Sequence, residues 1–171
     1  MVCVFEISSL EAPDFKRVVQ ISSEDTFEEL HLAIQNTAGF DQTQLASFFI
    51  TDDYWRKQIE ISQLDSSGKN KSRVLNMHRI KIEDYISEIG QKLVYVFDFF
   101  NERFFYVELK EKLMKTDLKE PFVAYEKGIL PNQFLIDDLE SPEVITRERD
   151  ESYKSFGDLE DYYEIFGEID A

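Results

Sequence analysis

Three observations predict an α+β domain followed by an acidic C-terminal tail. The 171 residues are 43% hydrophobic and 14% aromatic, which is enough apolar material for one folded core. Several short runs are rich in β-branched and aromatic residues, as strands are. One longer stretch repeats its apolar residues at helical spacing between a start signal and a stop signal.

The first half of the chain is predicted to contain four strands and one clear helix. The strands are expected over residues 2–7, 15–21, 46–51 and 55–61. An apolar stripe at helical spacing predicts the helix and a place in the core for its members, Phe27, Leu30, Ile34 and Ala38.

The ends of this helix carry the usual capping residues. Ser23 or Asp25 can cap its start, because their side-chain oxygens can accept hydrogen bonds from the first backbone amides. Gly39 can end it by adopting a left-handed conformation.

The second half is dominated by an aromatic hairpin. Residues 93–100 and 104–109 carry the strongest strand signals, and the short polar connection between them predicts an antiparallel pair. Residues 65–73 contain no apolar side chain and are predicted to form a loop. Short helices are predicted over 80–89, ended by Gly90, and over 109–118.

The last part of the chain is predicted to be irregular and then strongly acidic. Pro121, Gly128 and Pro131 indicate an irregular crossing. Residues 136–171 hold thirteen acidic and three basic residues, in a chain whose net charge is -16. They are predicted to form a mobile linker and then a short amphipathic helix.

This tail helix is a candidate partner-binding element. Its apolar stripe consists of Leu159, Tyr162, Tyr163 and Phe166. A helix this short is rarely stable alone in water, so it is expected to bind a partner's groove or to fold back on its own domain. A protein partner is therefore expected, although its identity and the oligomeric state are left open.

Composition argues against several kinds of site and targeting. Cys3 is the only cysteine, and His31 and His78 are the only histidines, so the ligands of a zinc site are missing. The glycines are too widely spaced for a phosphate-binding loop. No metal or cofactor is expected. Neither a signal peptide nor a membrane-spanning apolar run is present, which predicts a cytoplasmic protein.

One basic stretch contrasts with this acidic chain. It contains no acidic residue and consists of Lys69, Lys71, Arg73, Arg79 and Lys81. It could bind nucleic acid, a partner's acidic surface or the chain's own tail, and a solvated loop explains it equally. Because the whole chain repels a polyanion, no binding of duplex DNA is expected at physiological salt.

His31 and Asp98 are the candidate residues of an active site. A histidine can act as the base beside a nucleophile, but His31 can equally be a helix residue at the edge of the core. Asp98 interrupts an apolar strand, either as an acid near His31 or as a carboxylate that faces solvent or caps the turn before Asn101.

Five segments, in order, resemble the Ri-plasmid ORF-three-like family. They are Phe-Lys-Arg-Val at 15–18, the helix at 26–35, Gly-Phe-Asp at 39–41, Val-Phe-Asp-Phe at 96–99, and Lys-Gly with a later proline at 127–131. The resemblance implies an α+β roll of mostly antiparallel strands with helices packed on the sheet, here assigned to residues 1–135. These proteins are widespread in bacteria, and some occur on plasmids and mobile elements.

The resemblance implies no established activity, and this chain departs from the family pattern at histidines. Gln44 and Ala46 follow the Gly-Phe-Asp segment, where the family usually carries histidines. Residues 100–105 replace the family's usual Gly-Asp-x-Trp-x-His. Chemistry built on those histidines therefore does not carry over.

Three functional hypotheses follow, and the first is favoured. The chain is a non-enzymatic binding or protein-interaction domain that uses the tail helix and the aromatic hairpin as contact surfaces. The alternative is a nucleic-acid-associated accessory protein of mobile-element type that uses the basic stretch. The weakest is an enzyme that uses His31 and Asp98.

Overall fold

The computed structural model describes residues 1–64, 74–114 and 118–134. The chain divides into two units, Met1–Gln133 and Phe134–Ala171, and the first is described below. The predicted loop over 65–73 lies outside the described residues. So do the predicted linker and the tail helix with its stripe, Leu159, Tyr162, Tyr163 and Phe166.

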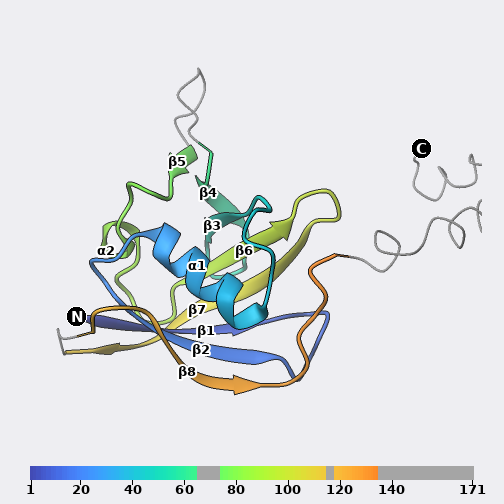
Figure 1. Ribbon diagram of the computed structural model, residues 1–171. Helices are drawn as coiled ribbons and strands as arrows, with labels where there is room; N and C mark the ends of the chain where they lie inside the picture. Colours follow the sequence, from blue (N-terminus) through green and yellow to red (C-terminus); the bar gives the residue numbers. More distant parts are fainter. Residues whose placement is uncertain (65–73, 115–117, 135–171) are drawn as a thin grey trace, which may run out of the picture. The chain divides into compact units, whose positions relative to one another are not determined.

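Within the described residues, eight strands form one mostly antiparallel sheet with two helices (Figure 1). The strand order is β5-β4-β3-β6-β7-β1-β2-β8, and β4 with β5 is the parallel pair among these strands. This confirms the predicted α+β class. The strands are β1 (Val2–Ser8), β2 (Lys16–Ser22), β3 (Ser47–Thr51), β4 (Lys57–Ser62), β5 (Val74–Asn76), β6 (Lys92–Asp98), β7 (Arg103–Leu113) and β8 (Phe122–Lys127).

Helix α1 (Phe27–Ala38) lies across one face of the sheet (Figure 1). It begins with a capping box, in which Glu29 N donates to Thr26 Oγ1 at 3.3 Å and Thr26 N donates to Glu29 Oε1 at 3.0 Å. The predicted cap at Ser23 or Asp25 is therefore wrong, because the Thr-x-x-Glu pattern starts the helix later. The predicted stop is confirmed, since Gly39 has a φ of 67°.

The core lies between α1 and the sheet. Phe27, Leu30 and Ile34 are all 0% exposed, which confirms that the apolar stripe is buried. On the sheet side, alternate residues of each strand face the helix, as period-two geometry requires. They include Phe5, Phe48, Tyr95 and Phe105.

The predicted antiparallel hairpin is confirmed as β6 and β7, while three other elements differ from expectation. The predicted helix over 80–89 is shorter, because α2 (Ile82–Tyr85) ends where Ile86 becomes extended. The predicted helix over 109–118 is wrong, since β7 continues to Leu113 and pairs there with Val2. The predicted irregular crossing contains β8, which pairs with β2.

Within the part of the chain that the structure describes, no helix is both long enough and apolar enough to cross a membrane.

Candidate functional site

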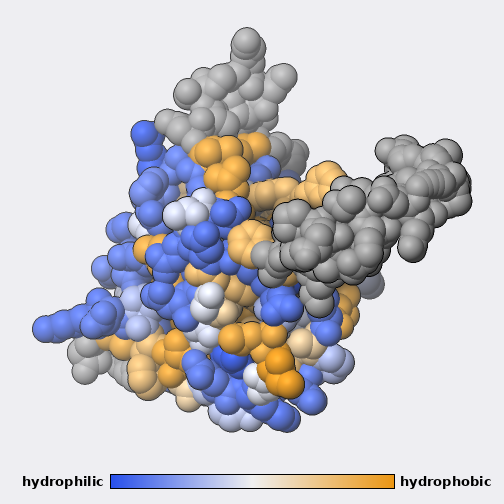
Figure 2. Space-filling view, turned by 45° about the vertical axis from the view of Figure 1, so that its right-hand side comes forward, coloured by the Kyte–Doolittle hydropathy of each residue, from blue (hydrophilic) through white to orange (hydrophobic). Residues whose placement is uncertain are grey.

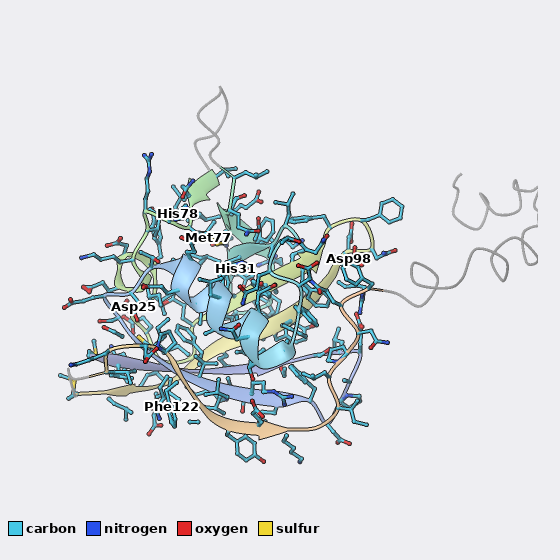
Figure 3. All side chains as sticks on the ribbon, viewed as in Figure 1. Asp25, His31, Met77, His78, Asp98 and Phe122 are labelled. Atoms are coloured by element: carbon cyan, nitrogen blue, oxygen red, sulfur yellow. The ribbon has the colours of Figure 1, made fainter. Side chains whose placement is uncertain are left out.

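A buried polar cluster joins α1 to the centre of the sheet. His31, predicted at the edge of the core, is 1% exposed and so lies inside it. Its Nδ1 lies 2.7 Å from the hydroxyl oxygen of Tyr95 on β6. Gln35 Nε2 donates to the same oxygen at 2.6 Å. Figure 3 marks His31 on α1.

Gln63 determines which imidazole nitrogen of His31 carries the proton. The Gln63 Oε1 accepts a hydrogen bond from Ala46 N at 2.6 Å, which directs its amide NH2 toward His31 Nε2, 3.3 Å away. The Nε2 atom must therefore accept, and Nδ1 carries the hydrogen that is donated to Tyr95. A second proton on Nε2 would meet the amide hydrogens of Gln63, so the geometry favours neutral histidine.

Burial also favours the neutral form of His31. Desolvation lowers the pKa of His31 from 6.5 to about 4. Burial raises the pKa of Tyr95 above its ordinary value, although the hydrogen bond from Gln35 opposes the shift. Both side chains are therefore neutral at pH 7, and their hydrogen bonds hold α1 on the sheet.

Acid is expected to destabilise the protein through His31. In the unfolded chain the imidazole has a pKa of 6.5, whereas in the folded chain it is about 4, so the unfolded state takes up a proton first as the pH falls. This contribution to stability should be lost between pH 6.5 and 4 and amount to about 3 kcal/mol in all. Urea denaturation of the wild type and of His31→Gln, at pH 7.5 and at pH 4, measures it.

Comparing the two proteins removes the contribution of other groups. Burial and the neighbouring Glu29 carboxylate raise the pKa of Asp25 to about 6, so Asp25 stabilises the fold less as the pH rises toward 6. Asp25 is present in both proteins, so its contribution cancels in the difference. A free energy of unfolding that falls equally in both would contradict the account of His31.

Asp98 ends β6 and caps the hairpin turn, which is one of the structural roles considered for it. Its carboxylate accepts hydrogen bonds from Asn101 N at 3.1 Å and from Asn101 Nδ2 at 3.0 Å. Burial alone would raise the pKa of Asp98. The hydrogen bonds from Asn101 and the nearby Arg103 guanidinium outweigh it and lower the pKa below its ordinary value.

Arg103 is a key residue that the sequence interpretation treated only as part of the hairpin connection. It begins β7 and is 8% exposed. Its Nε and Nη2 atoms donate to the two carboxylate oxygens of Glu11 at 2.9 and 2.8 Å. Its Nη1 donates to Gln133 O at 2.8 Å, and Nη2 also donates to Asn132 O. One guanidinium thus joins three segments: the hairpin, the loop after β1 and the segment after β8.

Gly128 allows the segment after β8 to reach this end of the sheet. Its φ of 85° is in the left-handed region, and a Cβ built there would lie 2.1 Å from the backbone oxygen of Asp14. Only glycine permits so close an approach to the loop between β1 and β2.

Exposed apolar side chains occur on all three segments that Arg103 joins. Phe99 and Phe100, in the turn between β6 and β7, are 45% and 92% exposed. The other two segments contribute Leu10, Ile129 and Leu130, which are also exposed. We call these five residues the hairpin-end surface. Figure 2 shows apolar side chains reaching the surface between hydrophilic ones.

The contacts of His31 and Asp98 give the two residues separate roles. The described hydrogen bonds of His31 are with Tyr95 and Gln63, and those of Asp98 are with Asn101 and Arg103. In Figure 3 the two labelled side chains lie apart, one on α1 and the other at the end of β6. The described contacts therefore do not bring the two candidate residues together.

The structure describes only part of the basic stretch. Arg79 and Lys81 are exposed between β5 and α2, whereas Lys69, Lys71 and Arg73 lie outside the described residues. His78 is exposed, and its Nδ1 contacts the Glu28 carboxylate. Within the described ranges, no group of three or more His, Cys, Asp or Glu side chains could hold a metal ion.

The strand order and the helix on one face of the sheet define a mostly antiparallel α+β domain. The chain belongs to the plasmid pRiA4b ORF-3-like protein family, whose family model matches residues 5–133. This confirms the resemblance drawn from the sequence. No curated protein matches the chain.

A solved structure supports the fold. A crystal structure of a protein of unknown function from Methanosarcina mazei Go1 superimposes with a TM-score of 0.59 and 21% sequence identity. The match covers 73% of this chain and 68% of that chain. At this identity the similarity establishes the fold alone.

Proposed function

We propose that the chain is a non-enzymatic binding domain whose hairpin-end surface contacts a partner protein. The observation that carries this proposal is the 92% exposure of Phe100, next to Phe99 at 45%, on a single turn. Adjacent exposed apolar side chains are typical of interaction sites, and aromatic residues commonly supply much of the binding energy at protein interfaces.

The turn that carries these phenylalanines is already ordered. Asp98 accepts two hydrogen bonds from Asn101, and Arg103 ties the start of β7 to Glu11. A contact surface that is held before binding loses less conformational entropy when a partner docks. The network around Arg103 therefore supports binding by fixing the tip of the hairpin.

The charge around the hairpin-end surface favours a basic partner. Glu11, Asp14 and Glu102 are exposed on the same loops, and Arg103, the cation between them, is buried and paired. The chain as a whole carries a net charge of -16. A basic surface with an apolar centre would be attracted over a distance and then bury the phenylalanines.

The tail helix predicted from the sequence is kept as a second proposed contact surface. Glu160, Asp161 and Glu164 lie between the residues of its apolar stripe, so this helix suits the same kind of basic partner. Comparing partner capture by the full chain with capture by a chain lacking residues 136–171 separates the two surfaces.

Phe100→Ser is expected to abolish capture of the partner without unfolding the domain. Its side chain is almost fully exposed, so the change removes apolar contact area from the interface and little from the core. Affinity purification of tagged full chain from the native cell, with quantitative mass spectrometry of the captured proteins, measures the loss.

Phe122→Ser supplies a matched control. Phe122 lies on β8, away from the hairpin, and is 53% exposed (Figure 3). This variant should capture the same proteins as the wild type, and both variants should keep the wild-type denaturation midpoint. Capture by Phe100→Ser that equals the wild type would refute the proposal.

A further inference from the structure

The sheet face opposite α1 carries four half-buried aromatic side chains. Val94 and Val96 of β6 point away from the helix, because their neighbours Tyr95 and Phe97 belong to the core beneath it. Residues directly opposite one another on paired strands share a face, and Val94 and Val96 face Phe49, Phe104 and Tyr106. Trp55 packs on Tyr106 with 4.2 Å between ring centroids. We call Phe49, Trp55, Phe104 and Tyr106 the outer aromatic face.

Trp55 is held on this face in an unusual conformation. Its φ of 66° is rare for a bulky residue and costs free energy. Asp52 secures the turn, because its carboxylate accepts hydrogen bonds from Tyr54 N at 2.8 Å and from Arg56 N at 3.0 Å, and pairs with the Arg56 side chain at 2.6 Å. The turn between β3 and β4 therefore presents the indole in a fixed position.

Two lysines lie over the rings of this face. Lys57 Nζ is 4.6 Å from the ring centroid of Phe49, and Lys92 Nζ is 5.5 Å from that of Trp55. Neither ammonium forms an ion pair with any carboxylate in the described part of the chain, although the protein has 35 acidic residues. Lys92 Nζ also donates a long hydrogen bond to Gly90 O at 3.4 Å, which leaves its charge unpaired. Lys57 and Lys92 can therefore neutralise an anion.

The carboxylates on the outer aromatic face are already engaged. Glu60, opposite Phe49, accepts a hydrogen bond from Ser47 Oγ at 2.7 Å. Glu108, opposite Lys92, lies 3.8 Å from Lys110 Nζ. These contacts reduce the repulsion that an anionic ligand would meet.

We propose that the outer aromatic face binds single-stranded nucleic acid. Bases stack on Trp55 and Tyr106, while Lys57 and Lys92 contact the phosphates. Proteins that bind single strands combine these two features, since every base offers a flat face for stacking. A duplex hides those faces and presents a denser charge, which this acidic chain repels. The proposal is independent of the hairpin-end surface.

Trp55 provides a direct assay, because it is the only tryptophan in the chain. Titrating full-length protein with a ten-nucleotide oligothymidylate at low salt should quench the Trp55 fluorescence to a plateau. Added salt should weaken this binding, and a duplex of the same length should leave the fluorescence unchanged. Tyr106→Ala should weaken binding by about fivefold or more, measured by anisotropy of a labelled oligonucleotide.

Two further variants separate the parts of the proposal. The double variant Lys57→Gln with Lys92→Gln should bind more weakly and with a smaller salt dependence. Tyr85→Ala, which removes an exposed aromatic residue on α2, should bind as the wild type does. The denaturation midpoint of each variant establishes that it is folded. Trp55→Phe is a milder change on the same face, and its binding is measured by the anisotropy of the labelled oligonucleotide.

Several outcomes would overturn the proposal. These are an absence of quenching at saturating oligonucleotide, equal binding of duplex, and unchanged binding by Tyr106→Ala and by the double lysine variant. Equal competition by inorganic polyphosphate would show a purely ionic contact. Quenching by a proline-rich peptide and not by the oligonucleotide would assign the face to a peptide ligand.

Discussion

Replacing Arg103 with alanine is expected to lower the free energy of unfolding by about 2–3 kcal/mol, because the arginine is buried while its partner Glu11 is partly exposed. The guanidinium is 8% exposed and makes a two-point contact with Glu11, at 2.9 and 2.8 Å, together with hydrogen bonds to two backbone carbonyls. Its removal leaves Glu11 without its cation and the carbonyls of Asn132 and Gln133 without these donors. Glu11 and Asn132 are exposed and can be hydrated, so most of the cost comes from the lost charge-assisted hydrogen bonds and the lost packing of the buried arginine side chain.

Urea denaturation of three arginine variants tests this role. Arg103→Lys keeps the charge and loses the planar two-point contact, so its loss of stability should be smaller than that of Arg103→Ala but still measurable. Arg79→Ala removes an exposed arginine and should change the free energy of unfolding by no more than about 0.5 kcal/mol. If Arg103→Ala were as stable as Arg79→Ala, the three segments would be held together by other contacts.

The Arg103 variants also connect stability with function. Loss of the guanidinium frees the loop after β1 and the segment after β8 from the hairpin. The tip that carries Phe99 and Phe100 then loses its fixed position, so the proposed partner should bind more weakly even under conditions where the domain remains folded.

The second large effect is expected for Ile34→Ala, which should lower the free energy of unfolding by about 2–5 kcal/mol. Ile34 is 0% exposed on the face of α1 that packs on the sheet. The substitution removes buried methyl and methylene groups and leaves a cavity that the surrounding core fills only in part. Denaturant unfolding followed by far-UV circular dichroism measures the loss.

Leu32→Ala is the matched control on the same helix. Leu32 is 36% exposed, so it contributes less buried apolar area than Ile34, while the change in helix propensity is small in both cases. The loss for Leu32→Ala should be clearly smaller. Equal losses would mean that the predicted stripe does not determine how α1 packs.

Sequence periodicity predicted those elements whose two faces differ in environment. Helix α1 buries one face and exposes the other, so its apolar residues repeat at the helical period, and burial alternates along β7. Strand β6 is different, because the residues from Leu93 to Phe97 are all buried and form a continuous apolar run, which also predicts a strand. The helix start was missed by a few residues because Ser23, Asp25 and Thr26 are all acceptable caps, and only the reciprocal bonds with Glu29 select Thr26.

Elements that depend on long-range pairing were not predictable in the same way. β8 is an edge strand in this sheet with mostly exposed side chains, so it shows no alternation to detect. The end of β7 has the composition of a helix, yet pairing with β1 extends it as a strand to Leu113. Tertiary context overrides local propensity at both places.

In the candidate site, too, roles that depend on nearby residues could be predicted and roles that depend on distant residues could not. The capping role of Asp98 involves Asn101, three residues away, and was among the interpretations that the sequence allowed. The role of Arg103 depends on Glu11 and Gln133, which are 92 and 30 residues away, and no local pattern connects them. The burial of His31 likewise depends on Tyr95, 64 residues along the chain.

Site-specific photo-crosslinking at position 100 tests the central claim most directly. A photoreactive benzoylphenylalanine placed at Phe100 in the full chain, and separately at Phe122, is irradiated in the native cell. The account predicts one dominant crosslinked protein with a basic contact surface from position 100, and its absence from position 122. Identical crosslinks from both positions, or none from position 100 while the tagged chain still captures partners, would contradict the claim that the hairpin end is the binding surface.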